Sequence, residues 1–258
     1  MLRPRIIPCL LIHDDGLVKT VKFKDPKYVG DPINAVKIFN EKEADELIVL
    51  DIDATANGRE PNFRLIAQLA AECRMPLCYG GGVTTVAHAK QIIGLGVEKV
   101  AISAAAVANP SLISQIASEI GGQSVVVVLD VKTSLFGKQE VWTHNGRKNT
   151  GKSPVDLARQ AATLGAGEIV INSIDRDGQM KGYDLELAKN MRDAIRLPIS
   201  VLGGAGSLGD ISELFETCGV VGAAAGSFFV FKGAFRAVLI SYPSPQEKEN
   251  LLQRLRKP

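Results

Sequence analysis

Short apolar runs alternate with amphipathic stretches along the whole chain. Most of these runs are nearly continuous Val, Ile, Leu and Ala, which is typical of parallel strands buried on both faces. The predicted strands are Ile6–Ile12, Leu47–Ile52, Leu77–Tyr79, Val100–Ser103, Val125–Val131, Ile169–Asn172, Ile199–Leu202 and Val220–Ala225. Between them, a capping side chain precedes a proline at Asp31-Pro32, Asn109-Pro110 and Ser153-Pro154, which predicts three helix starts. Eight strands that alternate with helices indicate a parallel sheet, either closed or doubly wound.

The two halves of the chain resemble each other. Pro76 precedes the cluster Gly80-Gly81-Gly82, and Pro198 precedes Gly203-Gly204. The second proline follows the first by 122 residues (198 − 76). The same spacing joins Glu46 to Glu168 and Asp53 to Asp175. This repeat indicates an internal duplication of about half the chain. Four βα units in each half give eight units, which predict a (β/α)8 TIM barrel built from two half-barrels. A doubly wound sheet is the alternative, but it would leave edge strands, and no run is polar enough to be one.

Composition narrows the class of protein. The 258 residues carry no linker or composition shift, so we expect a single barrel domain over residues 1–258. Thirty basic and 28 acidic residues give a formal charge of +2, which argues against nucleic-acid binding but leaves room for a local phosphate site. The longest uncharged apolar stretch, Cys218–Phe231, is too short to span a membrane. Four cysteines without a CxxC pair predict a reduced, soluble, cytoplasmic protein.

Two glycine clusters follow the third and seventh predicted strands, at the end of a barrel where chemistry takes place. Small residues follow the fourth and eighth strands. Glycine lets backbone N–H groups approach an anion closely, and a following helix N-terminus adds positive potential. The sequence therefore predicts two phosphate cradles, one of Gly81, Gly82 and Ala104 and the other of Gly203, Gly204, Gly226 and Ser227. The alternative is that these glycines only permit tight turns.

Polar residues elsewhere at strand ends are candidates for catalysis. Asp130 ends an otherwise apolar strand, where a carboxylate is costly unless it faces an open mouth. Asp177, before Gly178, is equally compatible with a turn and with catalysis. Lys19 falls in a long first loop and taken alone would be an ordinary exposed lysine. The histidines are scattered, with His13 and His144 expected in loops and His88 in a helix, so we predict neither a metal site nor a cofactor.

Charges also precede the first, second, fourth and sixth strands. These residues alternate in sign and are Arg5, Glu46, Lys99 and Glu168. One such charge would be a solvated flank, but four from different strands predict a ring that closes the barrel floor. A partner protein could dock there, although exposed ion pairs contribute little to stability.

Over roughly residues 1–232 the sequence resembles the cyclase subunit of imidazole glycerol phosphate synthase. The motifs that carry the resemblance are Arg5–Leu10, Ala44–Leu47 leading into Asp51, Gly80–Gly82, Ala105–Val107 with Asn109-Pro110, Gly165–Ile169, Asp175–Gly178, Gly182–Asp184 and Gly203–Gly206. The resemblance implies a barrel that forms a heterodimer with a glutaminase subunit on its floor. Ammonia would enter through the charged ring and react at the mouth with a ribulosyl aminoimidazole carboxamide nucleotide that carries two phosphates. The products would be imidazole glycerol phosphate and aminoimidazole carboxamide ribotide, a lyase reaction of histidine biosynthesis.

By the same resemblance, two aspartates act as acid and base, and Lys19, Asp51 and Asp177 orient the substrate. Asp130 matches one of the two aspartates, but the other position, directly after Cys9-Leu10, is Leu11. Leucine cannot carry a proton, and the loss of one acid–base group costs about 10²–10⁴-fold in rate. Phosphoribosyl isomerases, a sister family, also need this acid, so Leu11 counts against them as well.

The departures cluster at the mouth and leave three functions open. Ser103, Ala104 and Leu202 also differ from the family pattern. The chain could be an ordinary cyclase, with the missing acid supplied by Asp14, water or substrate. It could be a paralogue that passes ammonia to the amidination of a surface-polysaccharide sugar. It could also be a non-catalytic scaffold that activates the glutaminase.

Overall fold

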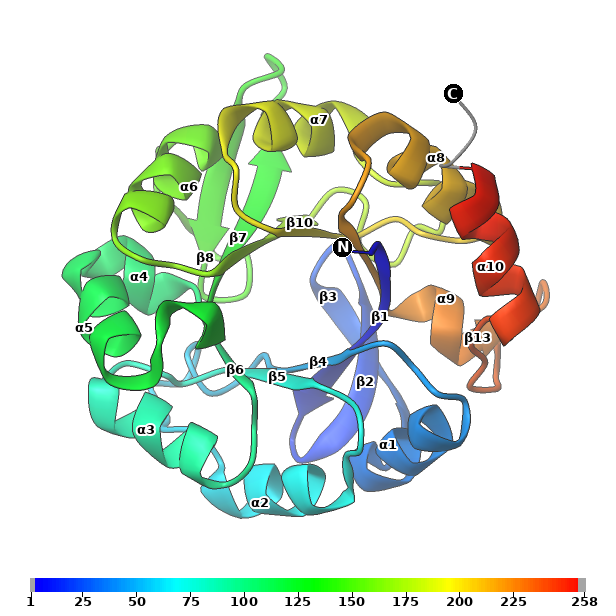
Figure 1. Cartoon of the computed structure of the whole chain (residues 1–258), viewed down its shortest axis with the longest axis horizontal. Helices are drawn as coiled ribbons and strands as arrows, with labels where there is room; N and C mark the ends of the chain where they lie inside the picture. Colours follow the sequence, from blue (N-terminus) through cyan, green and yellow to red (C-terminus); the bar gives the residue numbers. More distant parts are fainter. Residues whose placement is uncertain (1–2, 255–258) are drawn as a thin grey trace.

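Eight parallel strands close into a barrel in the computed structural model, which describes residues 3–254 (Figure 1). The order around the barrel is that of the chain, and pairing of β12 with β1 and of β10 with β7 leaves no open edge between barrel strands. The barrel strands are β1 (Arg5–His13), β4 (Leu47–Asp51), β5 (Leu77–Gly80), β6 (Lys99–Ile102), β7 (Val125–Thr133), β10 (Glu168–Ser173), β11 (Ile199–Leu202) and β12 (Gly222–Ala225). The closed barrel is confirmed, and the doubly wound alternative is wrong.

Helices surround the strands as an outer ring (Figure 1). They are α1 (Pro32–Glu41), α2 (Phe63–Glu72), α3 (Val86–Gly94), α4 (Ala104–Ala108), α5 (Ser111–Ile120), α6 (Pro154–Thr163), α7 (Leu185–Ala194), α8 (Leu208–Cys218), α9 (Ser227–Val230) and α10 (Pro245–Arg254). Asp31 and Ser153 cap α1 and α6 as predicted. The third prediction is wrong in detail: α5 begins at Ser111, and the Asn109 side chain accepts a hydrogen bond from the Ser111 hydroxyl instead of capping the backbone. Within residues 3–254, no helix is both long and apolar enough to cross a membrane.

Three short antiparallel arms extend from the barrel near its mouth. They are β2 (Gly16–Val21) with β3 (Lys24–Gly30), β8 (Gln139–Thr143) with β9 (Lys148–Asn149), and β13 (Phe231–Lys232) with β14 (Ala237–Val238). The first arm corrects two predictions, because Lys19 belongs to β2 rather than to a loop and His13 is the last residue of β1. Asp14 and Asp15 both have positive φ, at 46° and 58°, and form the tight turn that makes this hairpin possible.

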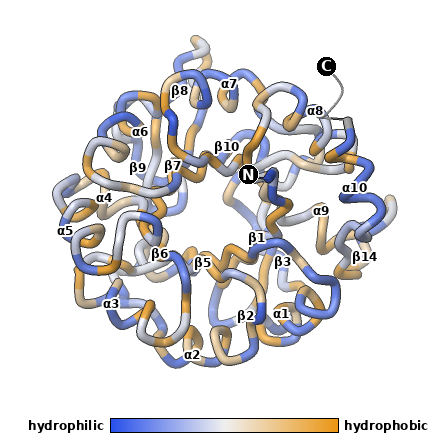
Figure 2. The backbone as a smooth tube through the Cα atoms, in the orientation of Figure 1, coloured by the Kyte–Doolittle hydropathy of each residue, from blue (hydrophilic) through white to orange (hydrophobic). Residues whose placement is uncertain are grey.

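The apolar residues form two layers. An outer core fills the space between strands and helices, and Figure 2 shows the corresponding hydrophobic strands at the centre of the molecule. A smaller cluster fills the barrel interior and consists of Ile7, Cys9, Ile48, Cys78, Ala101, Val126, Val128, Val170, Leu202 and Ala224. The interior between floor and mouth is therefore apolar, as in other eight-stranded barrels whose centre is packed with side chains.

The structure shows the predicted duplication. The helix α7 begins and ends 122 residues after α2 (185 − 63 and 194 − 72), and β11 follows β5 by the same distance. A Cβ atom on Gly81 would lie 2.5 Å from the Asp51 carbonyl oxygen, and one on Gly203 would lie 2.6 Å from the Ser173 carbonyl oxygen. Ser173 is again 122 residues beyond Asp51. The two half-barrels therefore repeat both their elements and their closest backbone contacts.

Candidate active site at the barrel mouth

The residues predicted for the mouth all line one cavity at the carboxyl ends of the strands. They are Lys19, Asp51, Gly81, Gly82, Ala104, Asp130, Asp177, Gly203, Gly204, Gly226 and Ser227, and Leu11 lines the same cavity. They come from the ends of all eight barrel strands, or from the segments directly after them, and from the first arm. Their convergence is confirmed, while the role of each residue stays a prediction.

Asp130 contributes a half-buried carboxyl group to this cavity. Its Oδ1 accepts a hydrogen bond of 2.9 Å from Nδ2 of Asn172, which faces it across the β7–β10 pairing. Burial raises the pKa of Asp130 to about 7, although the hydrogen bond from Asn172 opposes the shift. A carboxyl group that titrates near neutral pH can give and take a proton, as general acid–base catalysis requires.

Asn172 was not among the predicted site residues. It follows the apolar run of β10, one residue before the end of the strand, just as Asp130 follows the apolar run of β7, and it is 4% exposed. A polar residue at the end of a solid apolar strand is the signal that could have identified it. Only the register of β7 and β10 shows that the two side chains meet.

Leu11 occupies the place that corresponds to Asp130 in the other half-barrel. Leu11 pairs with Leu50 across β1 and β4, and Asp130 pairs with Asn172 across β7 and β10. Leu50 and Asn172 are 122 residues apart (172 − 50), so the two pairs are equivalent in the repeat. One half of the mouth therefore carries a polar pair and the other half an apolar pair. Asp14 does not line the cavity, and its exposed side chain provides no replacement acid there.

Lys19 is buried, which corrects the expectation of an ordinary exposed lysine. Its Nζ donates a hydrogen bond of 2.6 Å to the Cys9 carbonyl oxygen and lies 2.8 Å from the point where a Cβ on Gly226 would stand. Burial lowers the pKa of Lys19, while the nearby Asp177 opposes the shift. A buried ammonium group beside the second glycine cradle is suited to an anionic ligand.

Asp177 holds the first arm against the mouth. Its Oδ2 accepts hydrogen bonds from the Thr20 hydroxyl (2.7 Å) and from Phe23 N (3.0 Å), and its carbonyl oxygen accepts one from Lys22 N (3.1 Å). Burial raises the pKa of Asp177, and these hydrogen bonds oppose the shift. The residue therefore has a positioning role in addition to the predicted role in substrate orientation.

Replacing Thr20 with valine is expected to loosen this arm. The substitution keeps the shape of a residue that is 4% exposed and removes the hydroxyl donor to Asp177. A hydrogen bond to a charged group contributes about 1.5–3 kcal/mol, so amide hydrogen exchange at Lys22 and Phe23 should accelerate about tenfold or more. Thr20→Ser, which keeps the hydroxyl, is the control. Equal exchange rates in both variants would show that the hydroxyl does not hold the arm.

Asp51 and its neighbour Asp53 anchor the loop that follows β4. Asp51 Oδ1 accepts hydrogen bonds from the backbone N–H groups of Asp53 (2.9 Å) and Ala54 (3.0 Å). Burial raises the pKa of Asp51, and the two hydrogen bonds oppose the shift. Since Asp51 also lines the cavity, it can present its second oxygen to a ligand.

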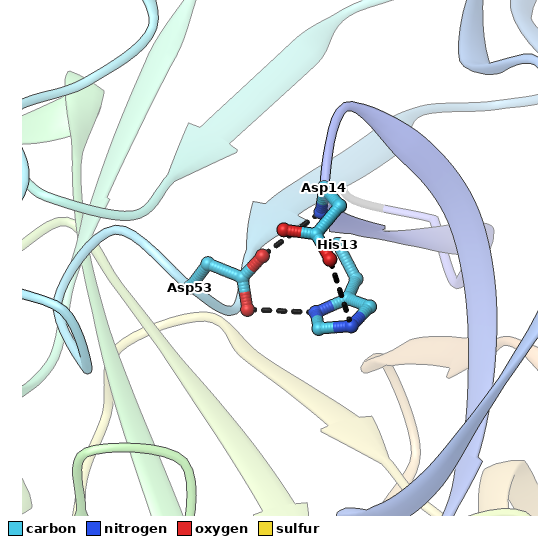
Figure 3. Close-up of side chains that lie close together, drawn as sticks. All are labelled: His13, Asp14 and Asp53. Carbon is cyan, nitrogen blue, oxygen red and sulfur yellow. Dashed lines mark hydrogen bonds and ion pairs between the residues drawn. The ribbon is translucent and has the colours of Figure 1, made fainter.

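His13, Asp14 and Asp53 lie close together beside the mouth, with potential ligand atoms within 4.8 Å of one another (Figure 3). Asp53 Oδ1 lies 2.8 Å from His13 Nδ1, and Asp53 Oδ2 accepts a hydrogen bond of 2.9 Å from Asp14 N. In the other half-barrel, Asp175 Oδ2 accepts the equivalent bond from Thr133 N (2.8 Å). The repeat favours a structural role for this cluster, which ties the strand-end turn to the neighbouring loop. That the protein uses no metal stays a prediction.

The glycine cradles have the backbone conformation that only glycine adopts readily. Gly81, Gly82, Gly203 and Gly204 have φ values of 125°, 71°, 94° and 112°. A Cβ on any of them would also lie within 3 Å of backbone atoms of a neighbouring strand or loop. Tight turns therefore explain part of the glycine requirement, and phosphate binding at these turns stays a prediction.

The four charged residues of the floor form one network. Arg5 contacts the carboxylates of Glu46 and Glu168, the latter at 2.7 Å, and Lys99 Nζ lies 2.7 Å from Glu46 Oε1 and 2.8 Å from Glu168 Oε2. Ser200 adds a hydrogen bond of 2.6 Å to Glu168. The predicted ring is thus present and closed at the end of the barrel opposite the cavity.

Mutual pairing fixes the charges of this floor ring. Burial would raise the pKa of Glu168, but hydrogen bonds and charge from Arg5 and Lys99 outweigh it and lower the pKa to about 2. Burial would lower the pKa of Lys99, and the two glutamates outweigh it and raise the value. Glu168 and Lys99 are therefore held in their charged forms by their partners, and the ring lies below an apolar interior.

A closed parallel barrel with a cavity at the carboxyl ends of its strands defines a (β/α)8-barrel protein of the class that carries its active site at that end. The family described as histidine biosynthesis protein matches residues 5–236. The chain is 56% identical to "Putative imidazole glycerol phosphate synthase subunit HisF" of Leptospira borgpetersenii, over 97% of this chain and 99% of that protein. It is 57% identical to "Putative imidazole glycerol phosphate synthase subunit hisF3" of Vibrio vulnificus, over 98% of each. It is 43% identical to imidazole glycerol phosphate synthase subunit HisF of Alkaliphilus metalliredigens, over 83% of this chain and 85% of that protein.

The chain belongs to this histidine biosynthesis family, as a divergent relative of the cyclase subunit of imidazole glycerol phosphate synthase. The resemblance stated from the sequence motifs is therefore confirmed.

Proposed function

We propose that this chain is the ammonia-accepting barrel subunit of a glutamine amidotransferase of the imidazole glycerol phosphate synthase type. The observation that carries the proposal is the closed ring of four paired charges at the floor, opposite the cavity at the mouth. A buried ion network is a poor way to stabilise a barrel, because apolar residues of similar size often do as well or better. A ring that must admit a small polar molecule supplies a functional reason for it. A glutaminase subunit would dock over this ring and release ammonia into the barrel.

At the mouth, the same proposal gives Asp130 the role of the remaining acid–base group. The two glycine cradles would hold the two phosphates of a ribulosyl aminoimidazole carboxamide nucleotide, with Lys19 beside the second cradle. Asp51 and Asp177 would orient the substrate between them. Because Leu11 offers no proton, we expect the chain to run the cyclase reaction slowly.

A second function is supported by Leu11 itself. The apolar pair Leu11–Leu50 removes the acid–base group from one half of the mouth while the floor ring stays intact. A paralogue that receives ammonia but delivers it to a different acceptor would show this pattern. The acceptor in that case would be a surface-polysaccharide sugar that a separate enzyme amidinates.

The decisive experiment mixes the chain with the glutaminase subunit of an imidazole glycerol phosphate synthase. We expect a one-to-one complex and accelerated glutamine hydrolysis, followed by slow turnover of the ribulosyl nucleotide with either glutamine or ammonium salt. Asp130→Asn should keep the complex and abolish the turnover, which separates docking from chemistry. Absence of any complex would overturn the amidotransferase proposal. A complex without turnover, even with ammonium, would select the paralogue.

A further inference from the structure

The side-chain amide of Asn172 forms a hydrogen bond through its nitrogen but not through its oxygen. Nδ2 donates to Asp130 Oδ1 at 2.9 Å, whereas Oδ1 of Asn172 is buried and has no hydrogen-bond partner among the described residues. When Asp130 is ionised, its carboxylate only accepts hydrogen bonds, so the NH₂ end of the amide faces it and the carbonyl end faces away. A buried acceptor without a partner is unfavourable, so this oxygen calls for a donor.

The surroundings of this oxygen restrict the donor to something small. It lies 3.2 Å from the point where a Cβ on Gly203 would stand, so the glycine leaves the place free. Leu202 is the register partner of Asn172 on β11 and offers no donor from its side chain. Asn172 also lines the cavity, and the apolar interior cluster lies between it and the floor ring.

Ammonia that entered through the floor ring would meet this oxygen where the apolar interior gives way to the cavity. The interior cluster consists of Ile, Val, Leu, Ala and Cys side chains and contains no side-chain oxygen. Ammonia carries N–H donors and a lone pair, and it reacts through the lone pair. An acceptor that holds one N–H orients the lone pair toward a substrate seated in the mouth.

We propose that Asn172 positions both partners of the ammonia-addition step, by holding the Asp130 carboxyl through Nδ2 and accepting a hydrogen bond from the incoming ammonia at Oδ1. The inference rests on the proposed function for the ammonia contact but not for the contact to Asp130. Asn172 itself forms and breaks no bond. With Oδ1 of Asp130 occupied by Asn172, Oδ2 is the oxygen left to exchange a proton with the substrate.

Other titratable groups that line the cavity can also affect the pKa of Asp130. The titratable groups that line it besides Asp130 are Cys9, Lys19, Asp51, His144 and Asp177. Among them, Asp177 adds to the rise in the Asp130 pKa, and burial is the main cause. The barrel strands β5, β6, β11 and β12 contribute no titratable side chain to the lining.

The first test is the titration of Asp130 in the full chain, followed by carboxyl ¹³C NMR and assigned with the Asp130→Asn variant. Asn172→Leu removes the donor at similar size, so the Asp130 midpoint should rise by about one pH unit, since a hydrogen bond to the ionised form is lost. Ser103→Ala is the control, because Ser103 lines the same cavity and its hydroxyl, also without a partner among the described residues, makes no bond to Asp130. An unchanged midpoint in Asn172→Leu would overturn the positioning of Asp130.

The second test measures the dependence of turnover on ammonium in the Leu11→Asp background, where activity is expected to be higher. Asn172→Leu should raise KM for ammonia about tenfold or more and leave KM for the ribulosyl nucleotide within about twofold. A lower kcat with an unchanged KM for ammonia would overturn the ammonia contact. If the background variant shows no turnover, the proposed cyclase function has failed together with the ammonia contact, and the titration still decides whether Asn172 positions Asp130.

Discussion

Replacing Leu11 with aspartate is expected to raise ammonium-dependent turnover of the ribulosyl nucleotide by about 10²–10⁴-fold, the usual contribution of one general acid–base group. Leu11 lines the same cavity as Asp130 and occupies the equivalent place in the other half-barrel. A carboxyl group placed there would meet an apolar neighbour, Leu50, so burial should raise its pKa as it does at Asp130. The new group would then titrate within reach of neutral pH.

Leu11→Asn is the matched control, because it introduces a polar side chain of the same size without a proton to exchange. We expect it to gain little, and the rate should be measured with ammonium salt at high pH so that the glutaminase plays no part. Equal rates in the two variants would contradict the idea that the rest of the mouth is an intact cyclase site. That result would favour a different ammonia acceptor.

The architecture could be predicted from the sequence because it depends on local patterns. Continuous apolar runs mark strands that are buried on both faces. The repeat spacing of 122 residues indicates that each half of the chain supplies the same number of strands. Strand ends then follow from where each run stops. For the same reason the residues at those ends, such as Asp130 and Gly203, could be assigned to one face before their contacts were known.

The remaining details depend on register and on contacts between distant segments. Asn172 became part of the site only because β7 and β10 align it with Asp130. The hairpin that places Lys19 in β2 turns at Asp14-Asp15, which is not one of the Asn-Gly or Asp-Gly pairs that mark such turns in a sequence. The burial of Lys19 also depends on the position of the first arm over the mouth. The hydrogen bond between Thr20 and Asp177 joins residues that are 157 positions apart in the chain, so no local sequence pattern predicts it.

Replacing Glu168 with glutamine is expected to lower the free energy of unfolding at pH 7 by about 3 kcal/mol. The pKa of Glu168 is lowered from 4.5 to about 2 in the folded chain, and each pKa unit corresponds to about 1.4 kcal/mol. The same order of magnitude, about 3–5 kcal/mol, is typical when one member of a buried ion pair is removed and its partners are left uncompensated. Here the uncompensated partners would be Arg5 and Lys99.

The pH dependence of this loss distinguishes the ion network from a packing defect. Because the folded pKa of Glu168 lies below its unfolded value, its contribution is fully present above about pH 5 and is lost as the pH falls through 4.5 toward 2. The unfolding free energies of the wild type and Glu168→Gln, measured by urea denaturation across this range, should therefore converge at low pH. Glu119→Gln is the control, since its ion pair with Lys90 is exposed and should contribute less than about 1 kcal/mol. A difference between the wild type and Glu168→Gln that stays constant from pH 7 to pH 3 would mean that the substitution disturbs packing and that the floor ring is not held together by charge.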